Sequence, residues 1–247
     1  MNDASLKEYT ALVVSEPYVF EMDGKVRTSP MGHQGWTAIL PSERHDVRWA
    51  VRSMLWVRKD IECEQVRVPS ADLTVALLRL PDRAVLLASV YVEGANGAAL
   101  SEAVMLLDMA ISSAQRRGGP RLDVVVAGDF NRHDQLWGGD GLLPTRQGEA
   151  DPIIDFMNRW SLESLLPRGT KTWQNAMHAT TIDLMLASQN LASDVLKCKI
   201  HDTEHGSDHR AIETSFDVEV PDRATQPRLL FKNAPPGTRF ESAFPEH

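Results

Sequence analysis

Cysteine is almost absent from this sequence of 247 residues, with only Cys63 and Cys198 present. Two isolated cysteines provide neither a disulfide framework nor a zinc-binding knuckle, and they fit a reducing compartment. Uninterrupted apolar stretches are short, so we expect no membrane span. The first ten residues, MNDASLKEYT, resemble neither a signal peptide nor a transit peptide. These absences predict an intracellular protein.

An excess of basic residues is also lacking, because 26 Lys and Arg face 34 Asp and Glu, a net charge of −8. This balance argues against a protein that coats DNA without specificity, which would be basic. It is compatible with an enzyme that gathers carboxylates around a metal. A hydrophobic content of 43% suffices for one large core. We expect one domain over residues 1–220, and a tail or linker over 221–247, which is rich in proline and charge.

The most informative stretch is LDVVVAGDFN at residues 122–131. An apolar run that ends in Gly128-Asp129 is typical of a buried strand that delivers a carboxylate to a cleft. Asp129 and Asn131 are two residues apart, so they point the same way in an extended backbone. Together they can bind a hard cation and orient a phosphate or a water. The same letters also fit a strand followed by an Asx-type turn, so the stretch needs partners elsewhere.

Two further strands are predicted to end on polar side chains. Residues 11–15 (ALVVS) are predicted to form a strand that Pro17 stops, which leaves Glu16 at its mouth. Taken alone, Glu16 fits a solvated loop equally well. Residues 84–92 are predicted to form a strand on which Tyr91 can contact a phosphate through its hydroxyl, although tyrosine is also common in half-buried strands.

The C-terminal half adds an acid and an acid–histidine pair. Asp183 falls in the otherwise apolar predicted strand 180–188, where a buried carboxylate needs a partner. Asp208 and His209 precede a predicted strand at 211–220. Neighbours on an extended backbone diverge, so we expect Asp208 to face a metal and His209 a phosphate, with Asp183 orienting the imidazole. A capped core histidine is the alternative for His209.

The remaining chain predicts a mixed α/β protein. Turn signals separate short strands, which favours antiparallel pairing in a sandwich or barrel. Residues 20–35 are interpreted as a loop, and residues 132–141 as a second loop in which Arg132 and His133 are more typical of solvated side chains than of phosphate ligands. Three- and four-residue apolar spacing predicts a helix over 99–117. The further predicted strands are 36–40, 48–57, 62–68, 73–80 and 195–200.

Taken in order, these motifs resemble the endonuclease/exonuclease/phosphatase superfamily. The resemblance covers residues 10–220. Within it, GDFNRHDQLWGG, TIDLMLAS and GSDHRAI are similar to the endonuclease domain of non-LTR, LINE-type retrotransposons, nearest to the fungal branch. RLLFKNAP at 228–235 resembles the segment that leads to a reverse transcriptase. The motifs that carry the resemblance are SEP at 15–17, VY at 90–91, GDFN at 128–131, TID at 181–183 and SDH at 207–209.

The resemblance implies a four-layered, DNase I-like α/β sandwich of two packed mixed sheets flanked by helices. It implies Mg²⁺- or Mn²⁺-dependent nicking of double-stranded DNA, no membrane, a nuclear location and a reverse transcriptase in the parent element. The implied roles cover seven residues. Glu16 and Asp208 would be metal ligands, and Tyr91 a phosphate contact. Asp129 would orient or deprotonate the attacking water, and Asn131 would hold the phosphate or that water. His209, oriented by Asp183, would bind the phosphate and stabilise its charge. Asp129 and His209 both remain candidates for the general base.

One departure from the family pattern lies at the start of the chain. Family members begin with a strand carrying a metal-holding Asn a few tens of residues before the glutamate, whereas only fifteen residues precede Glu16 and Asn2 is too near it. We therefore expect the first strand to be missing, a neighbouring edge to be exposed, and activity to be reduced or lost in a truncated or domesticated fragment. The alternatives are a phosphatase on the same fold and a catalytically dead nucleic-acid-binding remnant. A purely structural role would require five ordered motifs to arise by accident.

Overall fold

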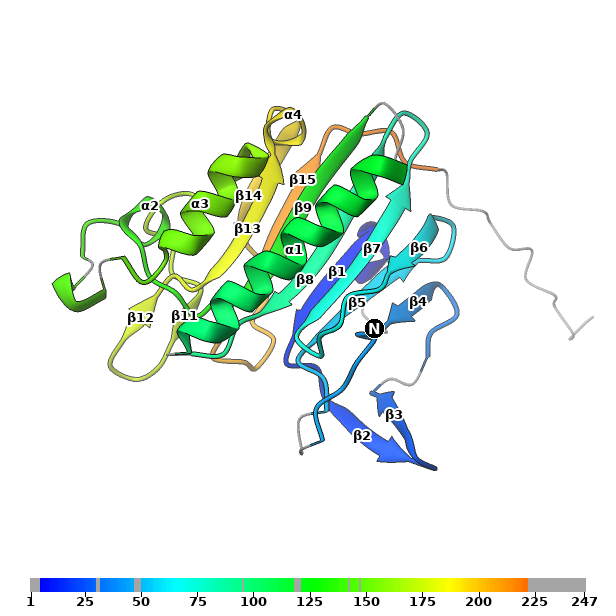
Figure 1. Cartoon of the computed structure of the whole chain (residues 1–247), viewed down its shortest axis with the longest axis horizontal. Coiled ribbons are helices and arrows are strands. Elements are labelled where there is room, and N and C mark those ends of the chain that lie inside the picture. The colour runs from blue at the N-terminus through cyan, green and yellow to red at the C-terminus, as the bar shows by residue number, and fades with distance from the viewer. Residues whose placement is uncertain are drawn as a thin grey trace, which may run out of the picture.

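The computed structural model describes residues 5–29, 32–46, 50–94, 96–117, 121–141, 143–146 and 148–221. The predicted tail lies outside these residues except for Pro221, and so does the start of the predicted strand 48–57. The folded part is an α/β sandwich, as predicted, and its central layer is a mixed six-stranded sheet (Figure 1). In spatial order this sheet contains β10 (Leu162–Ser164), β13 (Asp183–Ser188), β9 (Leu122–Asp129), β8 (Ala84–Tyr91), β7 (Leu73–Arg79) and β6 (Glu62–Val66).

One face of this sheet is covered by helices. α1 (Gly97–Arg117) and α3 (Asp151–Trp160) pack there, and their buried side chains form the larger core with β7, β8 and β9. The Asn96 side chain accepts a hydrogen bond from the Ala99 backbone N–H, so it caps α1 and starts the helix two residues before the predicted boundary. Apolar residues at three- and four-residue spacing form the buried inner face of α1.

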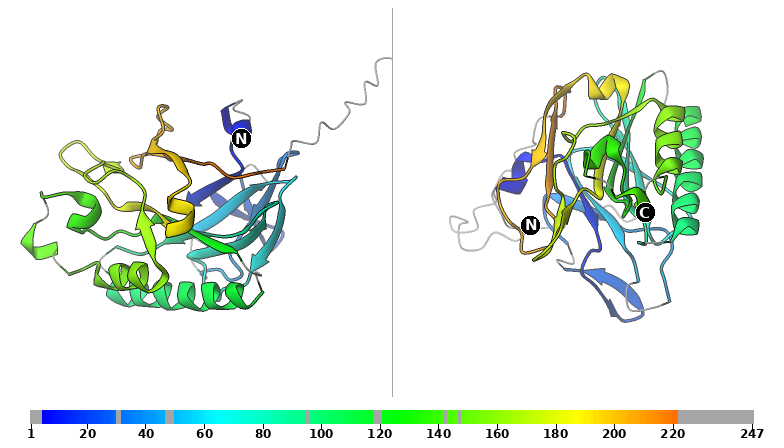
Figure 2. Two further views of the ribbon diagram at one scale, coloured as in Figure 1. Left: turned by 90° about the horizontal axis from the view of Figure 1, so that it is seen from above. Right: turned by 90° about the vertical axis from the view of Figure 1, so that its left-hand side faces the viewer.

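The other face carries a second, divided layer of strands. β1 (Ala11–Ser15), β5 (Ser53–Arg58) and β4 (Trp36–Ile39) form one antiparallel sheet, and β14 (Val195–Ile200) pairs with β15 (Ile212–Phe216) in another. Both pieces pack on the central sheet through a second apolar cluster. On the far side of this layer, the helical layer that we predicted is reduced within the described residues to the short 3-10 helix η1 (Ser5–Glu8) (Figure 2).

The segment predicted as a loop over 20–35 contains a β-hairpin instead. β2 (Val19–Met22) and β3 (Lys25–Thr28) pair around Asp23-Gly24, and both turn residues have positive φ, 53° and 70°. Asp-Gly is well suited to that turn, and the prediction treated the glycine only as a breaker. A second hairpin, β11 (Trp173–Gln174) with β12 (Ala179–Thr180), takes the start of the predicted strand 180–188.

Three short helical segments complete the described elements. They lie in loops between strands, and they are α2 (Gln135–Gly138), η2 (Pro144–Arg146) and α4 (Gln189–Ala192).

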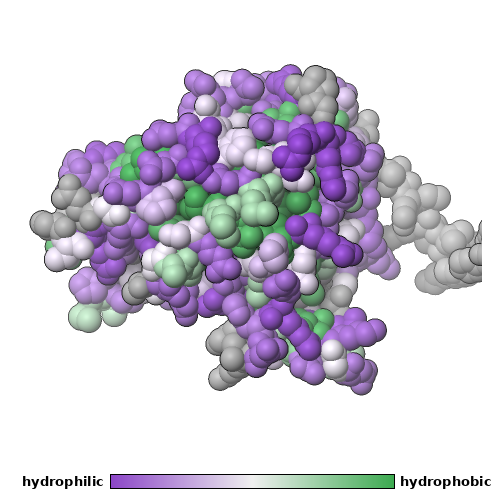
Figure 3. Space-filling view, viewed as in Figure 1, coloured by the Kyte–Doolittle hydropathy of each residue, from purple (hydrophilic) through white to green (hydrophobic). Residues whose placement is uncertain are grey.

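Helix α1 is long and apolar enough, by length and composition, to cross a membrane, which differs from our expectation of no such run. Its apolar residues are used in the core, because Leu100, Leu107 and Ile111 are at most 1% exposed. Its outer face keeps Met105 and Met109 exposed. Figure 3 shows this as apolar surface over the helix, bordered by hydrophilic side chains.

The parallel pair β8–β9 is the centre of the fold. Gly128 has φ of 143°, and a Cβ placed there would lie 2.0 Å from the Val90 carbonyl oxygen. Only glycine permits this approach of the two backbones. The pair is therefore held close at the end that delivers Asp129.

Candidate active site

Three of the predicted site residues lie in one row across three neighbouring strands. In the backbone register Tyr91 on β8 is the partner of Asp129 on β9, and Asp129 is the partner of Asp183 on β13. β8 and β9 end at this row and β13 begins there. The strand pairing alone thus brings the three side chains to one edge of the central sheet.

Asp129 is buried and held by its own turn. Its side chain is 4% exposed, its Oδ1 accepts the Asn131 backbone N–H at 2.9 Å, and its Oδ2 accepts the Asn131 side-chain amide at 2.8 Å. Asn131 has φ of 49°, so the turn, and not the extended alternation that we predicted, brings the two side chains together. The Asn131 amide also donates to the Val92 carbonyl, which fixes its orientation.

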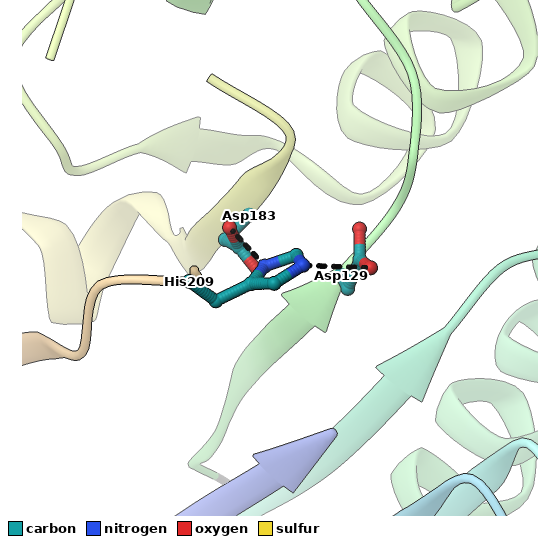
Figure 4. Close-up of side chains that lie close together, drawn as sticks. All are labelled: Asp129, Asp183 and His209. Atoms are coloured by element: carbon teal, nitrogen blue, oxygen red, sulfur yellow. Dashed lines mark hydrogen bonds and ion pairs between the residues drawn. The ribbon is translucent and has the colours of Figure 1, made fainter. Parts of the chain in front are cut away.

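His209 lies between the two aspartates (Figure 4). Its Nδ1 is 3.0 Å from both carboxylate oxygens of Asp183, and its Nε2 is 3.9 Å from Asp129 Oδ2. The predicted contact between His209 and Asp183 is therefore present. The hydrogen bond to Asp183 raises the pKa of His209 to about 9, against the opposing effect of burial. The imidazole is accordingly cationic at neutral pH.

Burial sets the protonation of Asp129. It raises the pKa of Asp129 to about 7, with the nearby Asp183 carboxylate as the second cause, while His209 opposes the shift. The two aspartates and His209 form a group whose ligand atoms lie within 4.8 Å of one another, a spacing at which a cation can be held. No other such group occurs within the described part of the chain.

Glu16 reaches the site from β1, beside Tyr91. It is exposed, with φ of 48°, and its backbone N–H donates to the Arg52 carbonyl. Burial, followed by the charge of Glu16 and a hydrogen bond to it, raises the pKa of Tyr91 to about 12. The phenol therefore stays protonated and can donate. Glu16 also contributes to the raised pKa of Asp129, although it lies outside the close Asp129–Asp183–His209 group.

Asp208 is directed elsewhere. Its carboxylate is exposed and accepts a hydrogen bond from the Trp173 indole N–H at 2.8 Å, and it does not belong to the close group.

The two loop residues weighed earlier also lie in defined contacts. Arg132 is buried and donates to three backbone carbonyls, so it is not the solvated side chain that we predicted, and His133 pairs with Glu149.

Two hydroxyls that position the site were not assigned a role from the sequence. Ser15 Oγ accepts the Asp129 backbone N–H and donates to the Val90 carbonyl, which ties β1 to the β8–β9 pair. Thr172 Oγ1 accepts the N–H groups of Ile182 and Asp183. Ser15 belongs to the SEP motif that carried the family resemblance, which was an available signal, whereas Thr172 lies outside those motifs.

This fold, with such a row of acids, amide, phenol and imidazole at its strand ends, is that of the DNase I-like class. A family model described as endonuclease-reverse transcriptase matches residues 85–213, more than half of the chain. The chain belongs to this family, within the endonuclease/exonuclease/phosphatase superfamily. A comparison with curated protein sequences found no match.

Solved structures with the same fold include nucleases and a phosphatase. The endonuclease domain of TRAS1, a telomere-specific non-LTR retrotransposon, is similar over 87% of this chain and 89% of its own, with 16% identity and a TM-score of 0.65. The AP endonuclease of Leishmania major is similar over 85% of this chain and 79% of its own, with 16% identity and a TM-score of 0.61. A 3′ phosphatase from Neisseria is similar over 84% of this chain and 89% of its own, with 16% identity and a TM-score of 0.56. At these identities the likeness shows the fold alone.

Proposed function

We propose that this protein is a divalent-metal-dependent endonuclease that nicks double-stranded DNA. The observation that carries the proposal is the placement of His209, which is fixed by Asp183 and points at the buried Asp129 carboxylate. A carboxylate able to take a proton lies beside a cation able to stabilise phosphate charge. That combination is suited to phosphodiester hydrolysis.

The donor set fits Mg²⁺ or Mn²⁺. Asp129 is a buried carboxylate with a raised pKa, which a cation would relieve, and Glu16 offers a second carboxylate to the same space. We assign the cation to Glu16 and Asp129 and the phosphate to His209, because the His209 Nδ1 is already bonded to Asp183. Asp208 would have to leave Trp173 to complete the shell.

In the proposed mechanism each residue has a distinct role. The cation, when bound, lowers the pKa of water and neutralises phosphate charge. Asp129, buried beside His209, accepts the proton of the attacking water. Asn131, held by two hydrogen bonds, orients that water or the phosphate. His209 and the protonated Tyr91 stabilise the charge that develops on the scissile phosphate.

The substrate proposal extends to the setting of the enzyme. The β11–β12 hairpin joins the site through the backbone bridge between Trp173 and His209, and its tip residue Met177 is 83% exposed. We assign to this hairpin a contact with the DNA groove. The family link to reverse transcriptases supports a parent element that uses the nick, and chromosomal DNA as the target would place the protein in the nucleus.

The test is a nicking assay on supercoiled plasmid with the whole chain. We expect relaxed circles with Mg²⁺ and none with EDTA, and a loss of about 10²-fold or more in Asp129→Asn and His209→Gln. A folded wild-type protein that makes no metal-dependent nick would refute the proposal.

A phosphatase is the second candidate, because a 3′ phosphatase shares the fold. The same preparation is therefore tested on an oligonucleotide duplex with a 3′-phosphate at an internal gap. Release of inorganic phosphate without plasmid nicking would favour the phosphatase. Duplex binding without either reaction would favour a non-catalytic remnant.

A further inference from the structure

Arg52 forms an ion pair with Asp72 next to two of the site residues, Tyr91 and Glu16. It immediately precedes β5, and its Nε and one terminal nitrogen donate to the two carboxylate oxygens of Asp72 at 2.8 and 2.6 Å. The same guanidinium lies over the ring of Tyr91, 4.6 Å from the ring centre. A planar guanidinium held on one side by a carboxylate can stack on an aromatic ring on the other.

The backbone groups of Arg52 and Asp72 are also hydrogen-bonded to residues of the site. The Arg52 carbonyl accepts the Glu16 N–H at 2.9 Å, and the Asp72 carbonyl accepts the Tyr91 N–H at 2.9 Å. Arg52 N–H in turn donates to the Ala71 carbonyl. Glu16 and Tyr91, which come from different sheets, are therefore each hydrogen-bonded to one member of the same ion pair.

The charge of Arg52 is already compensated. Asp72 binds it in a bidentate manner, Glu93 lies 3.7 Å from its remaining nitrogen, and its side chain is only 17% exposed. His45 also contacts Asp72, through Nε2 at 2.8 Å. A guanidinium so engaged is poorly placed to receive a phosphate itself. Its geometry is that of a group acting on the tyrosine and the glutamate.

We propose that Arg52 is a positioning residue that holds the Tyr91 ring, and with it the hydroxyl, against Glu16 at the phosphate side of the site. The inference rests on the proposed nuclease function for its kinetic consequence. The cation over the ring also favours donation by the phenol, so Arg52 acts through Tyr91 and not on substrate.

A double-mutant cycle on plasmid nicking tests this. We expect Arg52→Met and Tyr91→Phe each to lower kcat by about 10- to 100-fold with less effect on KM. The double variant is expected to be no slower than the slower single variant, because both changes remove one function. Effects that multiply, or an unchanged kcat in Arg52→Met, would overturn the proposal.

Arg58→Met is the matched control. Arg58 lies at the other end of β5, has a side chain 11% exposed, and is held by Asp60 and the Pro221 carbonyl, away from the acids of the site. We expect it to lower the melting temperature while kcat stays at the wild-type value. A fall in kcat equal to that of Arg52→Met would reduce Arg52 to a general stability role.

A second readout does not depend on activity. The sequence contains three tyrosines, Tyr9, Tyr18 and Tyr91, so a Tyr9→Phe, Tyr18→Phe protein labelled with 3-fluorotyrosine reports Tyr91 alone. Arg52→Met is expected to shift and broaden this fluorine resonance, and Arg58→Met to leave it in place. A shift in a protein that does not nick would refute the nuclease and keep the positioning role. Metal-dependent nicking by the wild type, together with a resonance that Arg52→Met does not move, would keep the nuclease and refute the positioning role.

Discussion

Asp129 and Asp183 are directly opposite each other on the antiparallel strands β9 and β13, and the imidazole of His209 lies between their carboxylates. Two acids in such register would repel each other if both were ionised without a cation nearby. His209 supplies that cation from the segment before β15. The chemistry of the site therefore depends on which of these three groups holds a proton.

Replacing Asp183 should change the protonation of His209. Asp183→Asn removes the main cause of the raised pKa, so the pKa of His209 should fall from about 9 towards 6.5 in the metal-free protein. Imidazole NMR, with His209→Gln to assign the resonance, measures it. Asp208→Asn is the control and should lower the pKa less, because its carboxylate is exposed and bonded to Trp173.

The same change has a defined effect on stability. A pKa that is higher in the folded state means that this proton stabilises the fold fully below pH 6.5, and that the contribution is lost as the pH rises through about 9. Asp183→Asn should therefore destabilise the protein more below pH 6.5 than above pH 9. Urea unfolding on both sides of this range gives the difference. Equal losses at both would show that the proton on His209 adds nothing to stability.

Asp129 should weaken the metal-free fold at neutral and alkaline pH. Its pKa is raised from 3.8 to about 7, so its ionisation costs stability progressively between these values. Asp129→Asn should stabilise the metal-free protein above pH 7 and have little effect below pH 3.8. Mg²⁺ should raise the melting temperature of the wild type and not that of Asp129→Asn. A wild-type melting temperature that does not change on addition of Mg²⁺ would contradict the metal assignment.

Gly128→Ala should be severely destabilising. The added Cβ would lie 2.0 Å from the Val90 carbonyl oxygen in a backbone conformation that L-residues avoid, so we expect a loss of roughly 3 kcal/mol or more in the free energy of unfolding. Gly97→Ala is the control, because nothing lies within 4 Å of the new Cβ at the start of α1. Denaturant unfolding compares the two. A mild effect at Gly128 would mean that β8 and β9 can separate.

Thr172→Val should disturb the position of Asp183. It leaves the buried N–H groups of Ile182 and Asp183 without their acceptor, which costs about 1–3 kcal/mol, and kcat should fall as well. Ser188→Ala is matched to it at the other end of β13, where Ser188 Oγ accepts the Val124 N–H and donates to Asp123. It should lose stability without losing kcat. Nicking rates normalised to the folded fraction decide between the two.

The strand ends could be predicted because local pattern determines them. An apolar run that ends in Gly-Asp marked β9, and a proline after Glu16 marked the end of β1. The contact between His209 and Asp183 followed from the need of a buried acid for a partner. The β2–β3 hairpin also had a local signal, the Asp-Gly turn, which was outweighed by the neighbouring glycines and prolines.

Other features of the site have no local signature. The Trp173 indole that holds Asp208, and the Asp72 carboxylate that holds Arg52, are long-range partners. Their pairing depends on which loops the finished sheets bring together. The left-handed turn at Asn131 was likewise hidden, because an Asp-x-Asn spacing fits both an extended strand and a turn.

The divided second layer has a consequence for heat inactivation. The register of β9 with β13 fixes the two aspartates relative to each other, whereas His209 comes from the segment before β15, which pairs only with β14 within the described residues. The imidazole is therefore held across the layers by its bond to Asp183, by the backbone bridge to Trp173 and by the hydrogen bond from the Trp173 indole to Asp208. Small slippage of one layer over the other would uncouple the proton-carrying groups while both sheets remain intact. Catalysis should then fade on warming before circular dichroism registers any melting.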